Sequence, residues 1–229
     1  MKRRILSTII NLLIGIASIL GVTLACIFAV EHGYSSPYVK LLYFTVQSNL
    51  WIGVVSIIVG VKSVIEIVKK EKIVCYTLYL LKFIFTVSIT LTGVIFCVLL
   101  APFADFNVWY FSSVLTHVVV PTLSICDLFI NQDQPKLKKK HVYLSIVPPL
   151  YYFFFAVILG ACNVDFGRGE PFPYFFLNFN SEVGLFGFLD SNPPQMGSFY
   201  WIVLIILFII GLSRLYYRFH PATKKYNKN

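Results

Sequence analysis

The sequence predicts an all-α membrane protein, a bundle of six transmembrane helices with both termini in the cytoplasm. Of its 229 residues, 58% are hydrophobic and only 13% are charged, whereas about a quarter of the residues in a soluble domain are charged. The apolar residues also collect in runs long enough to cross a bilayer, which takes about 20 residues. We therefore expect a single membrane domain over residues 1–229.

Six apolar segments meet this length requirement. The first follows Lys2-Arg3-Arg4, as in a signal peptide, but it is too long for a signal h-region and has no clear cleavage site. We therefore interpret it as the first span. The six expected spans cover about residues 5–30, 41–65, 73–101, 108–130, 142–162 and 199–217.

The basic residues alternate between the two sides of the predicted membrane. Sixteen of the 19 lysines and arginines fall in the N-terminus, the second and fourth connections and the tail. Only Lys40 and Arg168 fall on the other side, and Lys82 lies within a span. The positive-inside rule then places both termini in the cytoplasm of a plasma-membrane protein. This topology accounts for the formal charge of +9 without a nucleic-acid partner.

Two further features concern the fifth span and the connection after it. Pro148 and Pro149 predict a kink in that span. The long connection at 163–195 is rich in Phe, Gly and Pro. This composition is typical of an aromatic belt at the lipid headgroups, or of a lid over a cavity that opens to the outer leaflet. Both interpretations stay open at this point.

The five cysteines lie in or beside apolar runs and form no C-x-x-C pair. We interpret them as small hydrophobic residues, with neither disulfides nor metal ligands expected. The sequence also has no nucleotide-binding glycine pattern and no H-E-x-x-H or G-x-S-x-G motif. We therefore expect no metal and no cofactor. The cysteines are Cys26, Cys75, Cys97, Cys126 and Cys162.

Polar residues recur at helical spacing within the second, third and fourth spans, and polar groups at this depth must face protein or water. Lys82 and Asp127 lie near the cytoplasmic boundary when residues are counted inward from the outer ends of their spans. We expect them to form a structural ion pair, or Lys82 to extend its amine to the interface. Lys62 and Glu66, four residues apart on one helix, predict a second pair.

His117 is the only histidine inside a predicted span, one turn before Pro121. Thr45 lies at a similar depth, and the second and fourth spans run in the same direction. The two side chains can therefore meet if these spans are neighbours. A hydroxyl beside an imidazole can act as a nucleophile with its general base. The alternative is a structural role, a neutral imidazole hydrogen-bonded to a backbone carbonyl or a serine.

At these residues the chain resembles the androgen-induced family of multi-span membrane proteins, and also related bacterial six-span proteins of unassigned role. Vertebrate members hydrolyse fatty acid esters of hydroxy fatty acids with an intramembrane Thr and His. Three patches carry the resemblance. They are Leu42-Tyr-Phe-Thr-Val-Gln-Ser-Asn-Leu50, Thr116-His-Val-Val-Val-Pro121 with Asp127 beyond it, and Pro173-Tyr-Phe-Phe-Leu177.

The resemblance implies a lipid-ester hydrolase with Thr45 as nucleophile and His117 as general base, and an acyl-ester substrate from the outer leaflet. No carboxylate lies near His117 in sequence, because Asp127 is about 15 Å away along the helix. Candidate donors to the oxyanion are Gln47, Ser48 and Asn49. Two other functions stay open: a transporter of small solutes or lipids lined by the same polar stripes, and a non-catalytic accessory subunit.

Overall fold

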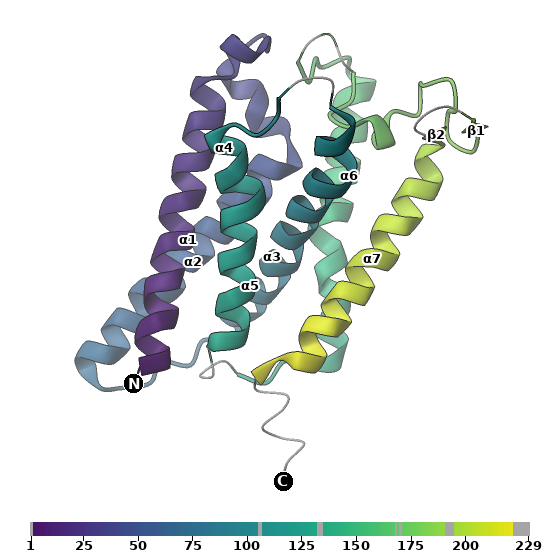
Figure 1. The fold of residues 1–229 in the computed structure, drawn as a ribbon. Coiled ribbons are helices and arrows are strands. Elements are labelled where there is room, and N and C mark those ends of the chain that lie inside the picture. Colours follow the sequence, from purple (N-terminus) through teal and green to yellow (C-terminus); the bar gives the residue numbers. More distant parts are fainter. Residues whose placement is uncertain are drawn as a thin grey trace.

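The structure, a computed structural model, describes residues 2–104, 107–131, 135–167, 169, 171–190 and 195–221. Within these residues, six helical segments are long and apolar enough to cross a membrane, which confirms the predicted fold class. The first segment begins and the last segment ends at the same end of the bundle (Figure 1). The segments are Lys2–Ile27, Phe44–Lys69, Tyr76–Phe103, Phe111–Ile130, Lys139–Ala161 and Ser198–Phe219.

Three of these spans are single α-helices, and three combine different helix types. The single helices are α1 (Lys2–Ile27), α2 (Phe44–Lys69) and α7 (Ser198–Phe219). The third span joins α3 (Tyr76–Ile95), the π-helix η3 (Phe96–Leu100) and the 3-10 helix η4 (Ala101–Phe103). The fourth span joins α4 (Phe111–Val114), the π-helix η5 (Leu115–Val119) and α5 (Val120–Ile130). The fifth span joins the 3-10 helix η6 (Lys139–Ile146) to α6 (Val147–Ala161).

The connections at the upper end of the bundle contain short elements. The first carries the 3-10 helices η1 (Val30–His32) and η2 (Pro37–Leu42). The fifth carries the 3-10 helix η7 (Phe175–Leu177) and a small antiparallel pair of strands, β1 (Phe188–Leu189) and β2 (Gln195–Met196). Aromatic residues of this fifth connection pack against the ends of the helices, so it forms part of the bundle's upper core.

A proline explains the π-helical turn in the fourth span. Pro121 has no N–H and cannot donate to the carbonyl of His117, four residues earlier. The N–H of Val120 instead donates to the Leu115 carbonyl, five residues earlier, which is the π-helical pattern. The same arrangement precedes Pro102 in the third span. His117 therefore lies in a widened turn.

The structure places the expected bend of the fifth span at the junction of η6 and α6. Pro148 and Pro149 lie in the first turn of α6, where proline is tolerated because the first N–H groups of a helix have no partner within the helix. The predicted kink inside one continuous helix is therefore a change from 3-10 to α-helical geometry.

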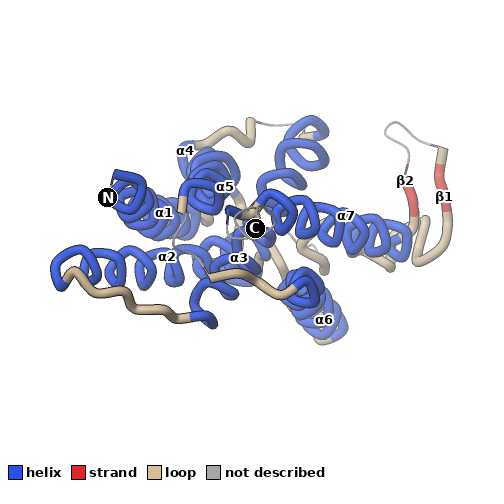
Figure 2. Tube along the Cα trace, turned by 90° about the horizontal axis from the view of Figure 1, so that it is seen from below, coloured by secondary structure: helices blue, strands red, loops and turns tan. Residues whose placement is uncertain are grey.

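The central helix of the bundle is α3, which contacts α2, α5, α6 and α7. In the view from below, α1 and α2 lie side by side at one edge, and α6 and α7 lie beyond α3 (Figure 2). Small residues allow α1 and α2 to approach closely. A Cβ atom added at Gly15 would lie 2.4 Å from Ile57, and one added at Gly53 would lie 2.8 Å from Ser18. Such small-residue contacts are typical of helix association in membranes.

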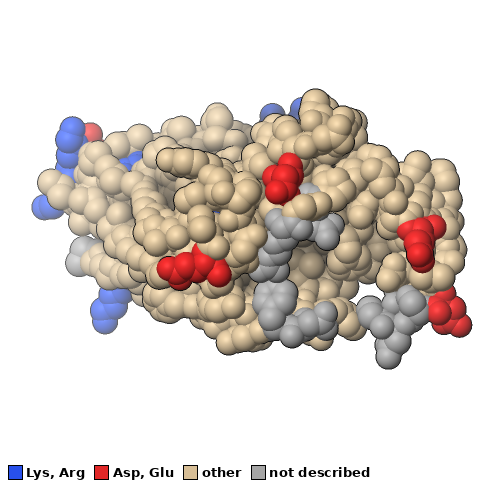
Figure 3. Space-filling model, turned by 90° about the horizontal axis from the view of Figure 1, so that it is seen from above, with Lys and Arg blue, Asp and Glu red and all other residues tan. Residues whose placement is uncertain are grey.

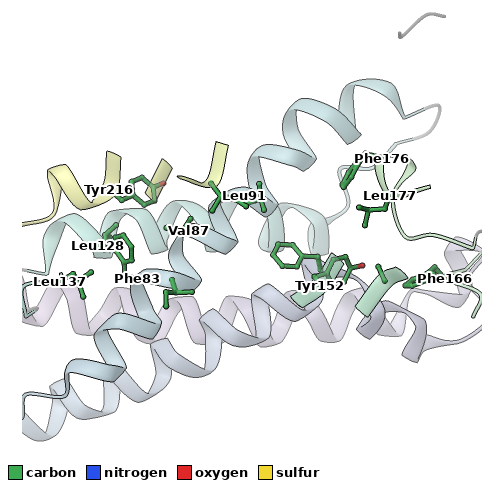
Figure 4. Close-up of a cluster of buried hydrophobic side chains, with 14 residues drawn as sticks. Phe83, Val87, Leu91, Leu128, Leu137, Tyr152, Phe166, Phe176, Leu177 and Tyr216 are labelled. Atoms are coloured by element: carbon green, nitrogen blue, oxygen red, sulfur yellow. The ribbon is translucent and has the colours of Figure 1, made fainter. Parts of the chain in front are cut away.

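The largest apolar cluster runs along the inner side of α3 from one end of the bundle to the other. Figure 4 shows Phe83, Leu128 and Tyr216 toward one end, and Phe166 and Leu177 from the fifth connection toward the other. The cluster therefore ties the third, fourth and last spans to the upper connection. This packing fixes the position of the fifth connection over the helix ends.

Charge separates the two ends of the molecule. Figure 3 views the upper end, where acidic side chains lie across the face and basic side chains lie mainly at its margin. The basic residues of the N-terminus and of the second and fourth connections belong to the opposite end. Four residues used in the charge count, Arg168, Lys224, Lys225 and Lys228, lie outside the described residues.

Gly93 is the position where α3 approaches the fourth span most closely. A Cβ atom there would lie 2.7 Å from the backbone carbonyl oxygen of His117. Because a backbone atom cannot move aside as a side chain can, we expect Gly93→Ala to destabilise the protein by about 1–3 kcal/mol. Thermal unfolding in detergent would measure this effect.

Gly211 in α7 supplies the matched control, because a Cβ atom added there meets nothing within 4 Å. Gly211→Ala should leave stability unchanged or raise it by up to about 1 kcal/mol through helix propensity. Equal melting temperatures for the two variants would contradict close backbone contact at Gly93.

Candidate functional site

A polar cavity of about 370 Å³ lies at the upper end of the bundle. Its walls come from the first connection, the start of α2, the π-helical turns of the third and fourth spans, and the fifth connection. Thr45 and His117 both line it, so the structure brings the two predicted residues to one cavity. Lys40, Tyr110 and Tyr174 are other polar residues of its wall.

An apolar cavity of about 80 Å³ adjoins the polar one. It lies among α3, α6, α7 and the fifth connection, and its wall includes Phe153, Ile202 and Ile205. Thr45 and Tyr174 line both cavities. The two residues therefore mark the place where a polar compartment meets an apolar one, whose volume is enough for a few carbon atoms of a chain.

Thr45 is the second residue of α2, whose N-cap Tyr43 makes no side-chain capping bond. The backbone N–H of Thr45 points out of the helix and donates to the Tyr174 hydroxyl at 3.4 Å. The hydroxyls of Thr45 and Tyr174 are 3.5 Å apart, a weak contact. Thr45 thus lies in the first turn of α2, at the positive end of the helix dipole.

His117 is held by stacking. Its ring lies 3.8 Å from the Phe96 ring, centroid to centroid, with an angle of 6° between the planes. The imidazole also interacts with the Thr92 backbone. Its Nδ1 atom is buried and has no hydrogen-bond partner among the residues that the structure describes. No hydrogen bond joins His117 to Thr45 within those residues.

Tyr174 is a residue of the site that the sequence did not single out. Its ring stacks on Phe176 at 5.0 Å with an interplanar angle of 3°. Burial raises the pKa of the Tyr174 phenol above its ordinary value of 10, and the hydrogen bonds with Thr45 oppose this rise only in part. The phenol is therefore protonated at neutral pH and can donate a hydrogen bond. The sequence signal that could have identified Tyr174 is its position in the third patch of the resemblance, Pro173-Tyr-Phe-Phe-Leu177.

The three predicted oxyanion donors point elsewhere. The Gln47 amide donates to the Leu41 carbonyl, and the Asn49 amide donates to the carbonyls of Thr45 and Thr116. The Ser48 hydroxyl lies 2.8 Å from the Thr92 hydroxyl. None of the three lines either cavity. Their hydrogen bonds go to η2, to the Thr45 carbonyl of their own helix, and to the third and fourth spans.

The predicted pairing of Lys82 and Asp127 is present in the structure, with 3.7 Å between Lys82 Nζ and Asp127 Oδ2. Lys82 is 2% exposed and Asp127 is 0% exposed, so the alternative of an amine extended to the interface does not hold. The amine also donates to Asn11 and Ser56. The pair therefore joins four helices, α1, α2, α3 and α5.

The second predicted pair is also present, with 2.8 Å between Lys62 Nζ and Glu66 Oε1. Glu66 in addition accepts the backbone N–H of Ile73. This arrangement ties the end of α2 to the start of the next connection. We therefore interpret both ion pairs as structural.

The segment from Pro173 to Leu177 lines the cavities from above. Pro173 and Phe175 line the polar cavity, while Phe176 and Leu177 line the apolar one. The long connection was interpreted either as an aromatic belt or as a lid over a cavity, and residues 173–177 lie where a lid is expected. Trp201 of α7 packs against Phe175, which connects the cover to the last span.

Comparison with family models, with curated proteins and with solved structures found no match. The described part of the chain contains no cluster of three or more His, Cys, Asp or Glu side chains that could hold a metal. The five cysteines are free thiols.

Proposed function

We propose that this protein hydrolyses an ester of a membrane lipid, with Thr45 as the nucleophile and His117 as the general base. The observation that carries the proposal is the position of Thr45. It shares a polar cavity with His117 and also borders an apolar cavity. An ester whose acyl chain fills the apolar cavity would have its carbonyl beside Thr45.

The chemistry follows from these positions. His117 accepts the Thr45 proton, directly or through a water molecule in the polar cavity, as Thr45 Oγ1 attacks the ester carbonyl carbon. The bond from this carbon to the alcohol oxygen then breaks, and His117 returns the proton to the departing alcohol. A water molecule next attacks the acyl-threonine, with His117 again as base, and releases the fatty acid and the free Thr45 hydroxyl.

The negative charge on the carbonyl oxygen has two sources of stabilisation near Thr45. Thr45 lies in the first turn of α2, at the positive end of the helix dipole. The Tyr174 hydroxyl, which contacts Thr45, supplies a further donor. These groups take the place that the sequence assigned to Gln47, Ser48 and Asn49.

The proposal includes the orientation of the protein in the membrane. The basic end of the bundle faces the cytoplasm by the positive-inside rule, so both termini are cytoplasmic. The two cavities then lie at the outer leaflet of the plasma membrane. The substrate accordingly comes from that leaflet, and the apolar cavity receives its acyl chain from the lipid side.

A long-chain alkyl fluorophosphonate tests the nucleophile directly, because it forms a stable adduct with an activated hydroxyl. We expect mass spectrometry of the labelled protein to find the adduct on Thr45, retained in Thr45→Ser and lost in Thr45→Val. Failure of the wild-type protein to form an adduct would overturn the proposal. Uptake of a solute or lipid into proteoliposomes without labelling would identify a transporter. The absence of both labelling and uptake would favour an accessory subunit.

A further inference from the structure

Lys40 is a cation in the wall of the polar cavity, and it has no acidic partner among the residues that the structure describes. It belongs to η2 and is half-buried, and its Nζ atom lies 3.5 Å from the centroid of the Tyr34 ring and 5.4 Å from that of Tyr43. No Asp or Glu lines this cavity among the described residues. The two rings hold the ammonium group by cation–π contact and leave its charge uncompensated.

An uncompensated charge in a partly enclosed cavity favours an anionic occupant. Lys and Asp or Glu are seldom buried unless paired, and the cavity has ample volume for a headgroup at about 370 Å³. The cavity wall therefore combines a positive potential with an imidazole and with Thr45.

The adjoining apolar cavity adds a second property to the occupant. Because Thr45 and Tyr174 border both compartments, one molecule can place a hydrocarbon chain on one side of Thr45 and a polar group on the other. Lys40 lies on the polar side. A neutral polar group would gain only a hydrogen bond from the ammonium group, whereas a carboxylate or phosphate would gain the hydrogen bond and the attraction between opposite charges.

We infer that the polar cavity is a headgroup subsite for an anionic amphiphile, and that Lys40 is the residue that selects its negative charge. The inference deepens the proposed function by naming the substrate class, but the binding it describes does not require catalysis.

Fluorescence quenching by brominated lipids measures this binding without turnover. Trp51 packs on Phe44, and Trp201 packs on Phe176, and both of these phenylalanines line the apolar cavity. A bromine-labelled chain in that cavity would therefore quench tryptophan fluorescence. The probes are dibromostearic acid, its uncharged methyl ester and a lysophosphatidic acid carrying the same chain, each added to the protein in nanodiscs of zwitterionic lipid.

We expect wild-type protein to bind at least one anionic probe about tenfold or more tightly than the methyl ester. Lys40→Gln should remove this preference without changing methyl ester binding, and Lys40→Arg should retain it. The stronger of the two anionic probes identifies a carboxylate or a phosphate as the preferred group. Lys69→Gln, at the exposed basic end of α2, is the matched control and should behave as wild type.

Equal binding of all three probes to wild-type protein would overturn the inference, as would a loss in Lys40→Gln that affects the methyl ester equally. Unchanged methyl ester binding by Lys40→Gln also shows that the variant is folded. The two proposals fail separately. Charge-selective binding without labelling of Thr45 removes the hydrolase alone, and labelling without charge selection removes the Lys40 subsite alone.

Discussion

Thr45→Val and His117→Phe are each expected to lower lipid-ester cleavage by about a thousandfold or more. Valine has nearly the shape of threonine but no nucleophilic oxygen. Phenylalanine can keep the stack that His117 makes on Phe96, so the variant loses the base with little loss of packing. Release of fatty acid from a long-chain ester by purified protein measures both effects.

The two substitutions should not be additive if the residues act on one step. We expect the double variant to be about as inactive as either single variant. Ser18→Ala is the control, because the Ser18 hydroxyl is buried in α1 with no hydrogen-bond partner among the described residues and lines neither cavity. Activity above about a tenth of wild type in His117→Phe would exclude His117 as the general base.

Lys82→Met is expected to destabilise the protein by about 3–5 kcal/mol, because it leaves the Asp127 carboxylate buried without its cation. Asp127 is fully buried, and its Oδ2 atom has no hydrogen-bond partner in the described part of the chain. The remaining donor to this carboxylate is the Ser7 hydroxyl. Unfolding in increasing concentrations of denaturing detergent would measure the loss.

Replacing both partners should recover most of this loss. Lys82→Met combined with Asp127→Leu removes both charges, and an apolar pair of similar volume is often as stable as a buried ion pair. Lys69→Met, on the exposed end of α2, should change stability by no more than about 0.5 kcal/mol. A double variant less stable than Lys82→Met alone would show that the polar side chains matter for reasons other than mutual neutralisation.

The positions of the spans could be predicted to within a few residues, since length and hydropathy are local properties. One of the differences has a cause in local backbone chemistry. The second span was expected from about residue 41 but begins at Phe44, because Pro37–Leu42 forms a separate 3-10 helix. That difference places Thr45 in the first turn of α2, at the positive end of the helix dipole.

The candidate site could be predicted only in part. Thr45, His117 and the Lys82–Asp127 pair were recognised because polar residues in an apolar span must face the interior. In the sequence, Lys40 contributes only to the charge pattern that predicts the topology. Tyr174 lies in the third patch of the resemblance, where nothing distinguishes it from the neighbouring aromatic residues. Both reach the site through connections, whose paths depend on contacts with distant helices rather than on local pattern.

The sequence by itself determined that six helices are long and apolar enough to cross a membrane, that charge separates the two ends, and that polar side chains face inward. Each of these follows from the solvation of individual residues in lipid. The tertiary structure alone decided that Thr45, His117, Lys40 and Tyr174 line one cavity. That outcome depends on helix rotation and tilt. These are set by the close approach at Gly93, by the prolines that widen the third and fourth spans, and by the packing of the fifth connection.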